Sequence, residues 1–136
     1  MGYCLEPRSK EVESWGANLV FMDYLRSLME MAGVNDDIIG KLCFCDGELV
    51  KKSEALEISG KLTAFMEANP VFLLTSGEMT EKYLDAMKKI SSSVELLGWN
   101  GDKYQGFEVC RKGDGCWKEI RGFVNFCRKS NGFRVY

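Results

Sequence analysis

Three stretches of this chain place apolar residues at intervals of three and four, the repeat that gathers side chains on one face of an α-helix. They lie in residues 15–32, 53–68 and 117–127. Each is followed by residues that stop helices, namely Gly33, Asn69-Pro70 and Asn131-Gly132. An apolar stripe has to be buried against another element, so these helices predict a packed core that the rest of the chain must fit.

The ends of the helices also carry signals. The first helix is predicted to begin at Trp15, with Ser14 as its N-cap residue. Thr80 can cap a further helix that carries Tyr83, Leu84, Met87 and Ile90. Asp36–Gly40 is interpreted as a short helical turn, so about four full helices are expected.

Short apolar or alternating runs separate the helices and predict strands. "VFLLTSGE" at 71–78 begins as a buried strand, "QGFEVC" at 105–110 follows a polar loop, and "FRVY" at 133–136 alternates as a terminal strand. Asp46-Gly47 marks a tight turn beside a short extended segment. The pattern predicts one compact α+β domain over residues 1–136, with the helices on a small sheet that includes the C-terminal strand.

The composition of the chain indicates how large a core it can form and which kinds of partner are disfavoured. The chain has 136 residues, 46% of them hydrophobic, which is enough for a core without metal or disulfide support. A net charge of -2 offers no general attraction to a phosphate backbone, so nucleic acid is disfavoured. No apolar run approaches the roughly 20 residues that span a bilayer, and the first residues lack a signal-peptide core. We therefore expect a cytoplasmic protein without a membrane partner.

Six cysteines raise the questions of disulfides and of zinc. Without an export signal the thiols are expected to be reduced, and cysteine most often packs as a small buried apolar residue. The pairs in "CFC" at 43–45 and "CRKGDGC" at 110–116 offer four thiolates to zinc, but their spacings are not those of structural zinc sites and histidine is absent. We predict largely buried thiols and neither a metal nor a cofactor.

The residues that usually perform catalysis are few. Without histidine there is no Ser-His-Asp or Cys-His arrangement, and neither a phosphate-binding loop nor a dinucleotide fingerprint occurs. A carboxylate site remains an alternative, formed by the acidic residues of one irregular segment, although the same residues suit helix starts and turns. They are Asp36, Asp37, Asp46 and Glu48. A thiol site is a further alternative: Cys110, with Arg111 and Lys112 beside it, is preferred to Cys127 on the apolar stripe.

The last residues, "CRKSNGFR" with Phe126 beside them, allow two interpretations. They can form a small stacking and phosphate platform for nucleic acid. The favoured interpretation is structural, with Phe133 in the core and Arg128 and Lys129 in the last helical turn, where cations favour the helix dipole. Phe123 and Val124 are predicted core residues.

Three segments, taken in order, resemble a family of small uncharacterised bacterial and phage proteins. They are "WGANLVFMDYLRSLMEMAGV", "ALEISGKLTAFMEA" and "EIRGFVNFCRKSNGFRVY", the last with a Phe-x-x-Phe-Cys run followed by Gly-Phe-x-Val. Residues 71–115 show no such similarity. The resemblance implies a small stand-alone protein carried by a phage or mobile element, and it implies no activity.

These exclusions favour a non-enzymatic protein-binding module, for instance an inhibitor or immunity-type protein. Its partner-binding surface is predicted in the polar, glycine-rich loop at 94–104, because tryptophan and tyrosine are enriched among interface hot spots. The predicted contact residues are Trp99, Asn100, Asp102 and Tyr104. Two alternatives stay open: Trp99 packs in the core, or the protein is an enzyme or ligand-binding domain that uses the carboxylates or Cys110.

Overall fold

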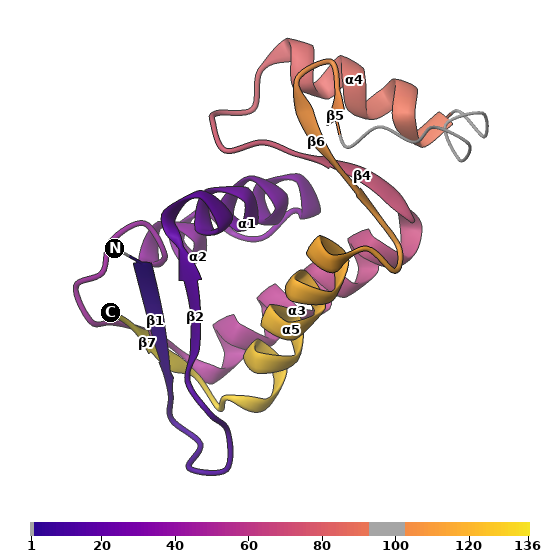
Figure 1. Ribbon diagram of the computed structural model, residues 1–136. Coiled ribbons are helices and arrows are strands. Elements are labelled where there is room, and N and C mark those ends of the chain that lie inside the picture. The colour runs from indigo at the N-terminus through magenta and orange to yellow at the C-terminus, as the bar shows by residue number, and fades with distance from the viewer. Residues whose placement is uncertain (1, 93–102) are drawn as a thin grey trace.

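One antiparallel sheet joins both ends of the chain. The computed structural model describes residues 2–92 and 103–136, and in it this sheet has the strand order β2-β1-β7-β3. The strands are β1 (Gly2–Pro7), β2 (Trp15–Asn18), β3 (Glu48–Val50) and β7 (Phe133–Val135). Leu5 of β1 faces Trp15 on one side and Val135 on the other. The prediction that the C-terminal strand belongs to a sheet is confirmed (Figure 1).

A second, three-stranded antiparallel sheet has the order β4-β6-β5. Its strands are β4 (Val71–Leu74), β5 (Lys103–Tyr104) and β6 (Phe107–Arg111), and α4 (Glu81–Ser92) packs on β4. The Tyr83 hydroxyl donates to the Leu73 carbonyl oxygen at 2.8 Å, and the Leu73 N–H lies 3.1 Å from the sulfur of Met87. Side chains of α4 therefore satisfy backbone groups at the edge of β4.

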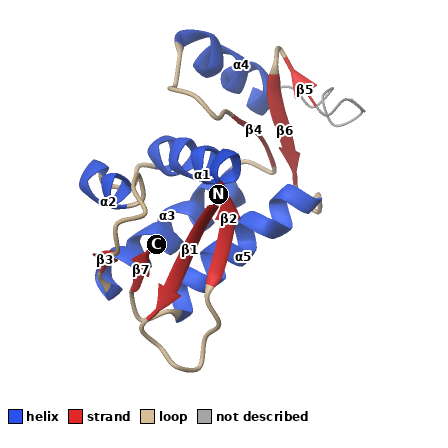
Figure 2. Ribbon diagram, turned by 60° about the vertical axis from the view of Figure 1, so that its left-hand side comes forward, coloured by secondary structure: helices blue, strands red, loops and turns tan. Residues whose placement is uncertain are grey.

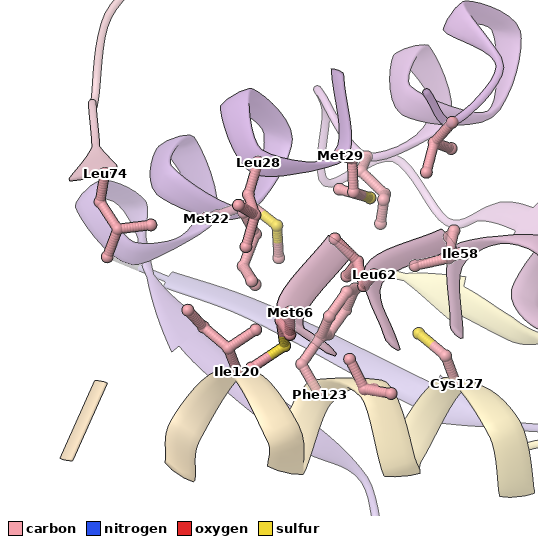
Figure 3. Packing of buried hydrophobic residues seen from close by; sticks show 14 of the residues in the cluster. Met22, Leu28, Met29, Ile58, Leu62, Met66, Leu74, Ile120, Phe123 and Cys127 are labelled. Atoms are coloured by element: carbon pink, nitrogen blue, oxygen red, sulfur yellow. The ribbon is translucent and has the colours of Figure 1, made fainter. Parts of the chain in front are cut away.

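The core lies among three helices placed between the two sheets (Figures 1 and 2). They are α1 (Leu19–Ala32), α3 (Lys52–Ala68) and α5 (Gly115–Lys129). Each contributes an apolar stripe, and Figure 3 shows the stripes facing one another. The stripe residues Met22, Leu28, Met29, Ile58, Leu62, Met66, Ile120, Phe123 and Cys127 are at most 2% exposed. Phe123 and Val124, at 0% and 2%, confirm the predicted core.

The first helix begins later than predicted, which corrects both its start and its cap. Residues Trp15–Asn18 form β2 against β1, and α1 begins at Leu19. The Asn18 side chain accepts the Phe21 N–H at 2.7 Å, so Asn18 and not Ser14 is the N-cap. At the other end Gly33 has φ +87°, and the Val34 N–H bonds to the Met29 oxygen at 3.0 Å, as a glycine C-cap requires.

Two other local predictions, the turn after the first helix and the Thr80 cap, agree with the structure. The turn at residues 36–40 is the short helix α2 (Asp36–Lys41), which brings the number of helices in the described residues to five. The Thr80 hydroxyl accepts the Tyr83 N–H at 3.2 Å and caps α4 as predicted.

The strand β1, in contrast, has no counterpart among the elements predicted from the sequence. None of the helices in residues 2–92 and 103–136 is long and apolar enough to cross a membrane.

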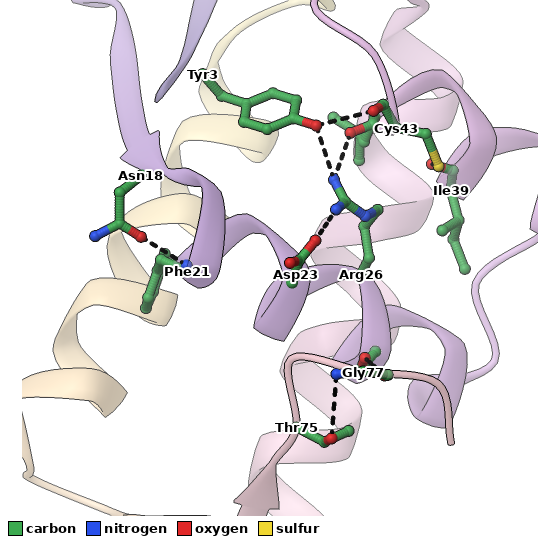
Figure 4. A network of polar contacts seen from close by, with 11 residues as sticks. Tyr3, Asn18, Phe21, Asp23, Arg26, Ile39, Cys43, Thr75 and Gly77 are labelled. Atoms are coloured by element: carbon green, nitrogen blue, oxygen red, sulfur yellow. Dashed lines mark hydrogen bonds and ion pairs between the residues drawn. The ribbon is translucent and has the colours of Figure 1, made fainter. Parts of the chain in front are cut away.

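Arg26 ties the first sheet to the segment after α2 (Figure 4). Its guanidinium donates to the Tyr3 hydroxyl at 3.1 Å and to the Leu42 carbonyl oxygen at 2.9 Å, and it pairs with Asp23. The Tyr3 hydroxyl donates in turn to the Cys43 carbonyl oxygen at 2.9 Å. The whole assembly is one compact α+β domain.

Candidate thiol site

Two cysteines meet where β6 turns into α5. Cys110 is near the end of β6, and Cys116 is the second residue of α5. The turn between them is closed by two hydrogen bonds: the Arg111 N–H donates to the Asp114 carboxylate at 3.1 Å, and the Asp114 N–H donates to the Arg111 oxygen at 2.9 Å. The chain therefore reverses within a few residues and returns the second cysteine to the first.

The sulfur atoms of Cys110 and Cys116 lie 2.9 Å apart. Their environments differ, because Cys110 is 0% exposed while Cys116 is partly exposed. We assign the shared proton to Cys110, since its burial disfavours a charge and the sulfur of Cys116 is reached by N–H groups at the start of α5. The arrangement pairs one partly exposed cysteine with one buried cysteine.

The pKa values of the two thiols move in opposite directions. The hydrogen bond to Cys116, burial and the nearby charges of Cys116 and Asp114 raise the pKa of Cys110 far above its usual range. The hydrogen bond from Cys110 lowers the pKa of Cys116, with help from the N–H groups of Trp117 and of Cys116 itself and against burial and Asp114. Cys116 is thus the member of the pair that loses its proton more readily, and the thiolate is the nucleophilic form of cysteine.

A cleft of about 340 Å³ is lined in part by Lys112, from the turn between the two cysteines, and by Trp117, the residue after Cys116. It is lined by Met66, Glu67, Pro70, Lys112, Trp117 and Arg121. The Trp117 ring packs against Phe72 with 5.5 Å between ring centroids, and Phe72 is the partner of Cys110 in the β4–β6 register. Lys112 belongs to the turn between the two cysteines, and its N–H donates to the Pro70 oxygen at 2.9 Å. Residues of the same turn and of the same helix start therefore line the cleft and carry the two thiols.

The structure corrects the prediction for Cys110. The sequence favoured it as a reactive thiol because basic residues adjacent to a cysteine can lower its pKa, but it is fully buried and its pKa is raised. The reactive member is Cys116, which sequence reasoning did not single out. A usable signal was present: a cysteine at the second position of a helix, shortly after a strand whose last residue but one is another cysteine.

The prediction that the cysteines are largely buried is wrong. All six lie in described residues and are free thiols, but only Cys110 and Cys127 are buried, while Cys43 and Cys45 are exposed. Burial raises the pKa of Cys127, which lies in the core. Within residues 2–92 and 103–136, no three cysteine or carboxylate side chains are grouped so that they could hold a metal ion.

The acidic residues take separate local roles. Asp36 and Asp37 form the first turn of α2, where the Asp37 N–H is capped by the side chain of Asn35 at 2.8 Å. Asp46 accepts the N–H of Glu48, the first residue of β3, at 3.2 Å. These contacts agree with the other interpretation of the acidic residues, in which they begin a helix and form a turn and do not make up a carboxylate site.

Three of the four predicted partner-binding residues, Trp99, Asn100 and Asp102, lie outside the described residues, so the predicted binding loop stays a prediction. Tyr104 is described: it belongs to β5, pairs with Phe107 and is half-buried against the core. Comparisons with protein-family models, with curated proteins and with solved structures return no match. The resemblance to small bacterial and phage proteins therefore also stays a prediction.

Proposed function

We propose that this protein is a thiol–disulfide redox protein in which Cys116 attacks and Cys110 resolves. The observation that carries the proposal is the 2.9 Å contact between the sulfur of a partly exposed cysteine at a helix start and that of a buried cysteine near a strand end. A disulfide bond is about 2.05 Å long, so the sulfurs need to approach by less than about 1 Å.

The chemistry follows from the two protonation states. The Cys116 thiolate attacks one sulfur of an external disulfide R–S–S–R, which forms a mixed disulfide and releases RS⁻. Cys110 then gives its proton to that RS⁻, which leaves as RSH, and the Cys110 sulfur attacks the sulfur of Cys116. The second RS⁻ leaves and takes a proton from water. Overall, the two cysteines lose two electrons, and the external disulfide becomes two thiols that take one proton from Cys110 and one from water.

Mass spectrometry of peptides after brief treatment with a small disulfide tests this proposal. The wild-type chain should form one internal disulfide, between Cys110 and Cys116. Cys110→Ser should stop at a mixed disulfide on Cys116, because the resolving thiol is missing, and Cys116→Ser should form no disulfide at Cys110. Cys43→Ser is the control, since it removes an exposed thiol away from the pair and should leave the 110–116 disulfide unchanged.

Two results would contradict the proposal. One is a wild-type chain in which Cys43 and Cys45 are consumed while Cys110 and Cys116 stay reduced. The other is a Cys110→Ser variant that carries its mixed disulfide at any position other than 116.

A second candidate function is the binding of another protein, and the β2 edge favours it. In the described residues β2 pairs only with β1, so its other edge offers backbone groups to an added strand. Leu19 and Val20 stand beside it at 47% and 53% exposure, next to a pocket of about 230 Å³ that Trp15 and Phe21 help to line. We infer an extended apolar peptide segment as the partner.

Selection from a displayed random peptide library tests this second candidate. Peptides with alternating apolar residues should bind the wild-type chain and lose most of their affinity for Val20→Glu. Leu56→Glu, at 44% exposure on α3, is the matched control and should bind the same peptides. Equal binding to Val20→Glu and to the wild-type chain would refute the assignment to this edge.

A further inference from the structure

The side chains that line the cleft carry a net positive charge, whereas the chain as a whole carries a net negative charge. The chain has a net charge of -2, but the cleft is lined by the cations Lys112 and Arg121 and by one anion, Glu67. The start of α5 adds the partial positive charge of a helix N-terminus. Asp114 of the turn is not among the lining residues; its carboxylate accepts the Arg111 N–H. The lining therefore favours an anionic group.

The rest of the lining fits the body of a small molecule. Met66, Pro70 and Trp117 supply apolar surface, and a volume of about 340 Å³ lies in the range of sites for small ligands. Trp117 follows Cys116 directly, and Lys112 lies in the turn between the two cysteines. The cleft is therefore lined by the residue that follows the attacking cysteine and by a residue of the turn between the two thiols.

We propose that this cleft binds the carboxylate-bearing part of a small peptide disulfide, of the chemical class of oxidised glutathione, and presents its sulfur–sulfur bond to Cys116. Arg121 and Lys112 pair with the carboxylates, and the Trp117 face packs on the peptide backbone. This inference rests on the proposed redox function for its chemistry. The binding step is separate from it and can be measured without any reactive sulfur.

Calorimetric titration with S-methylglutathione, which keeps the carboxylates and has no free thiol, measures the binding step. The wild-type chain should bind it, and Arg121→Gln and Lys112→Gln should each weaken binding by roughly fivefold to tenfold, because each removes one of the two cations. Arg128→Gln is the control, because it makes the same change two turns further along α5. No binding by the wild-type chain, or equal binding by Arg121→Gln, would overturn the proposal.

Reaction rates with three disulfides then separate this inference from the redox function. Oxidised glutathione is anionic, bis(2-hydroxyethyl) disulfide is neutral and cystamine is cationic. The wild-type chain should react fastest with the anionic reagent, and Arg121→Gln should reduce that preference by roughly tenfold while its rate with the neutral reagent stays the same. Added salt should have a similar effect.

Each outcome has one meaning. Reaction with all three disulfides at equal rates refutes the cleft proposal and leaves the redox function standing. Binding of S-methylglutathione without reaction at Cys116 refutes the redox function and leaves the cleft as an anion-binding site.

Discussion

The hydrogen bond between α4 and the edge of β4 predicts a measurable loss of stability in Tyr83→Phe. Tyr83 is 1% exposed, and its hydroxyl donates to the Leu73 carbonyl oxygen at 2.8 Å. Phenylalanine keeps the ring and its contact with Phe107, whose centroid lies 5.3 Å away, but leaves a buried carbonyl without this donor. A buried acceptor that loses its donor costs about 1–3 kcal/mol. We expect the free energy of unfolding at pH 8 to fall by that amount.

The stabilisation that Tyr83 provides should also depend on pH. Burial raises the pKa of Tyr83 to about 12 from its ordinary value of 10. The unfolded chain therefore releases the proton first, so the stabilising contribution is complete below pH 10 and is lost as the pH rises toward 12. One pH unit corresponds to about 1.4 kcal/mol, so the wild-type chain should lose about 1.4 kcal/mol through this group by pH 11. Tyr83→Phe lacks the group and should not lose it.

Urea denaturation followed by circular dichroism at pH 8, 10 and 11 measures both effects. The advantage of the wild-type chain over Tyr83→Phe should be largest at pH 8 and should shrink between pH 10 and pH 11. Tyr136→Phe, which changes a tyrosine that is 49% exposed, is the control and should match the wild-type chain. A Tyr83→Phe variant as stable as the wild-type chain at pH 8, or a difference that stays constant to pH 11, would refute the reasoning.

Three further predictions concern the core, a turn and a helix. Phe123→Ala should lower the free energy of unfolding by about 3–5 kcal/mol, because Phe123 is 0% exposed and packs on Trp15 at 5.1 Å; an unchanged thermal midpoint would contradict this. Gly132→Ala should destabilise by more than about 1 kcal/mol, because its φ is +91° and the new Cβ would lie 2.8 Å from the Val50 carbonyl oxygen. Gly60→Ala has open space within α3 and should stabilise by about 0.5–1 kcal/mol, so chemical denaturation of the two glycine variants should give opposite signs.

The helices could be predicted because their signals are local. The stripe at 53–68 and the Thr80 cap are visible within a few residues, and both match the structure. The error at Trp15 has a non-local cause: residues 15–18 continue an apolar pattern that suits a helix, but pairing with β1 draws them into a strand. β1 itself depends on partners at both ends of the chain, which no local pattern contains.

The thiol site could be predicted only in part. The sequence directed attention to Cys110 through its charged neighbours, whereas the pKa of that thiol is set by burial and by a second sulfur. Whether two cysteines meet depends on the geometry of the turn between them, which the Asp114 carboxylate fixes by accepting a backbone N–H. Spacing in sequence does not determine that distance.

The place of β7 inside the first sheet has a consequence for how the chain folds. β7 joins β1 to β3, so Leu5 cannot pair with Val135 until almost the whole intervening chain has been made and brought back. Contacts so distant in sequence slow folding, because a large loop must close before they form. Until then the β1–β2 hairpin has an apolar face and an unpaired edge. During synthesis this hairpin is therefore open to association with other chains or to capture by a chaperone.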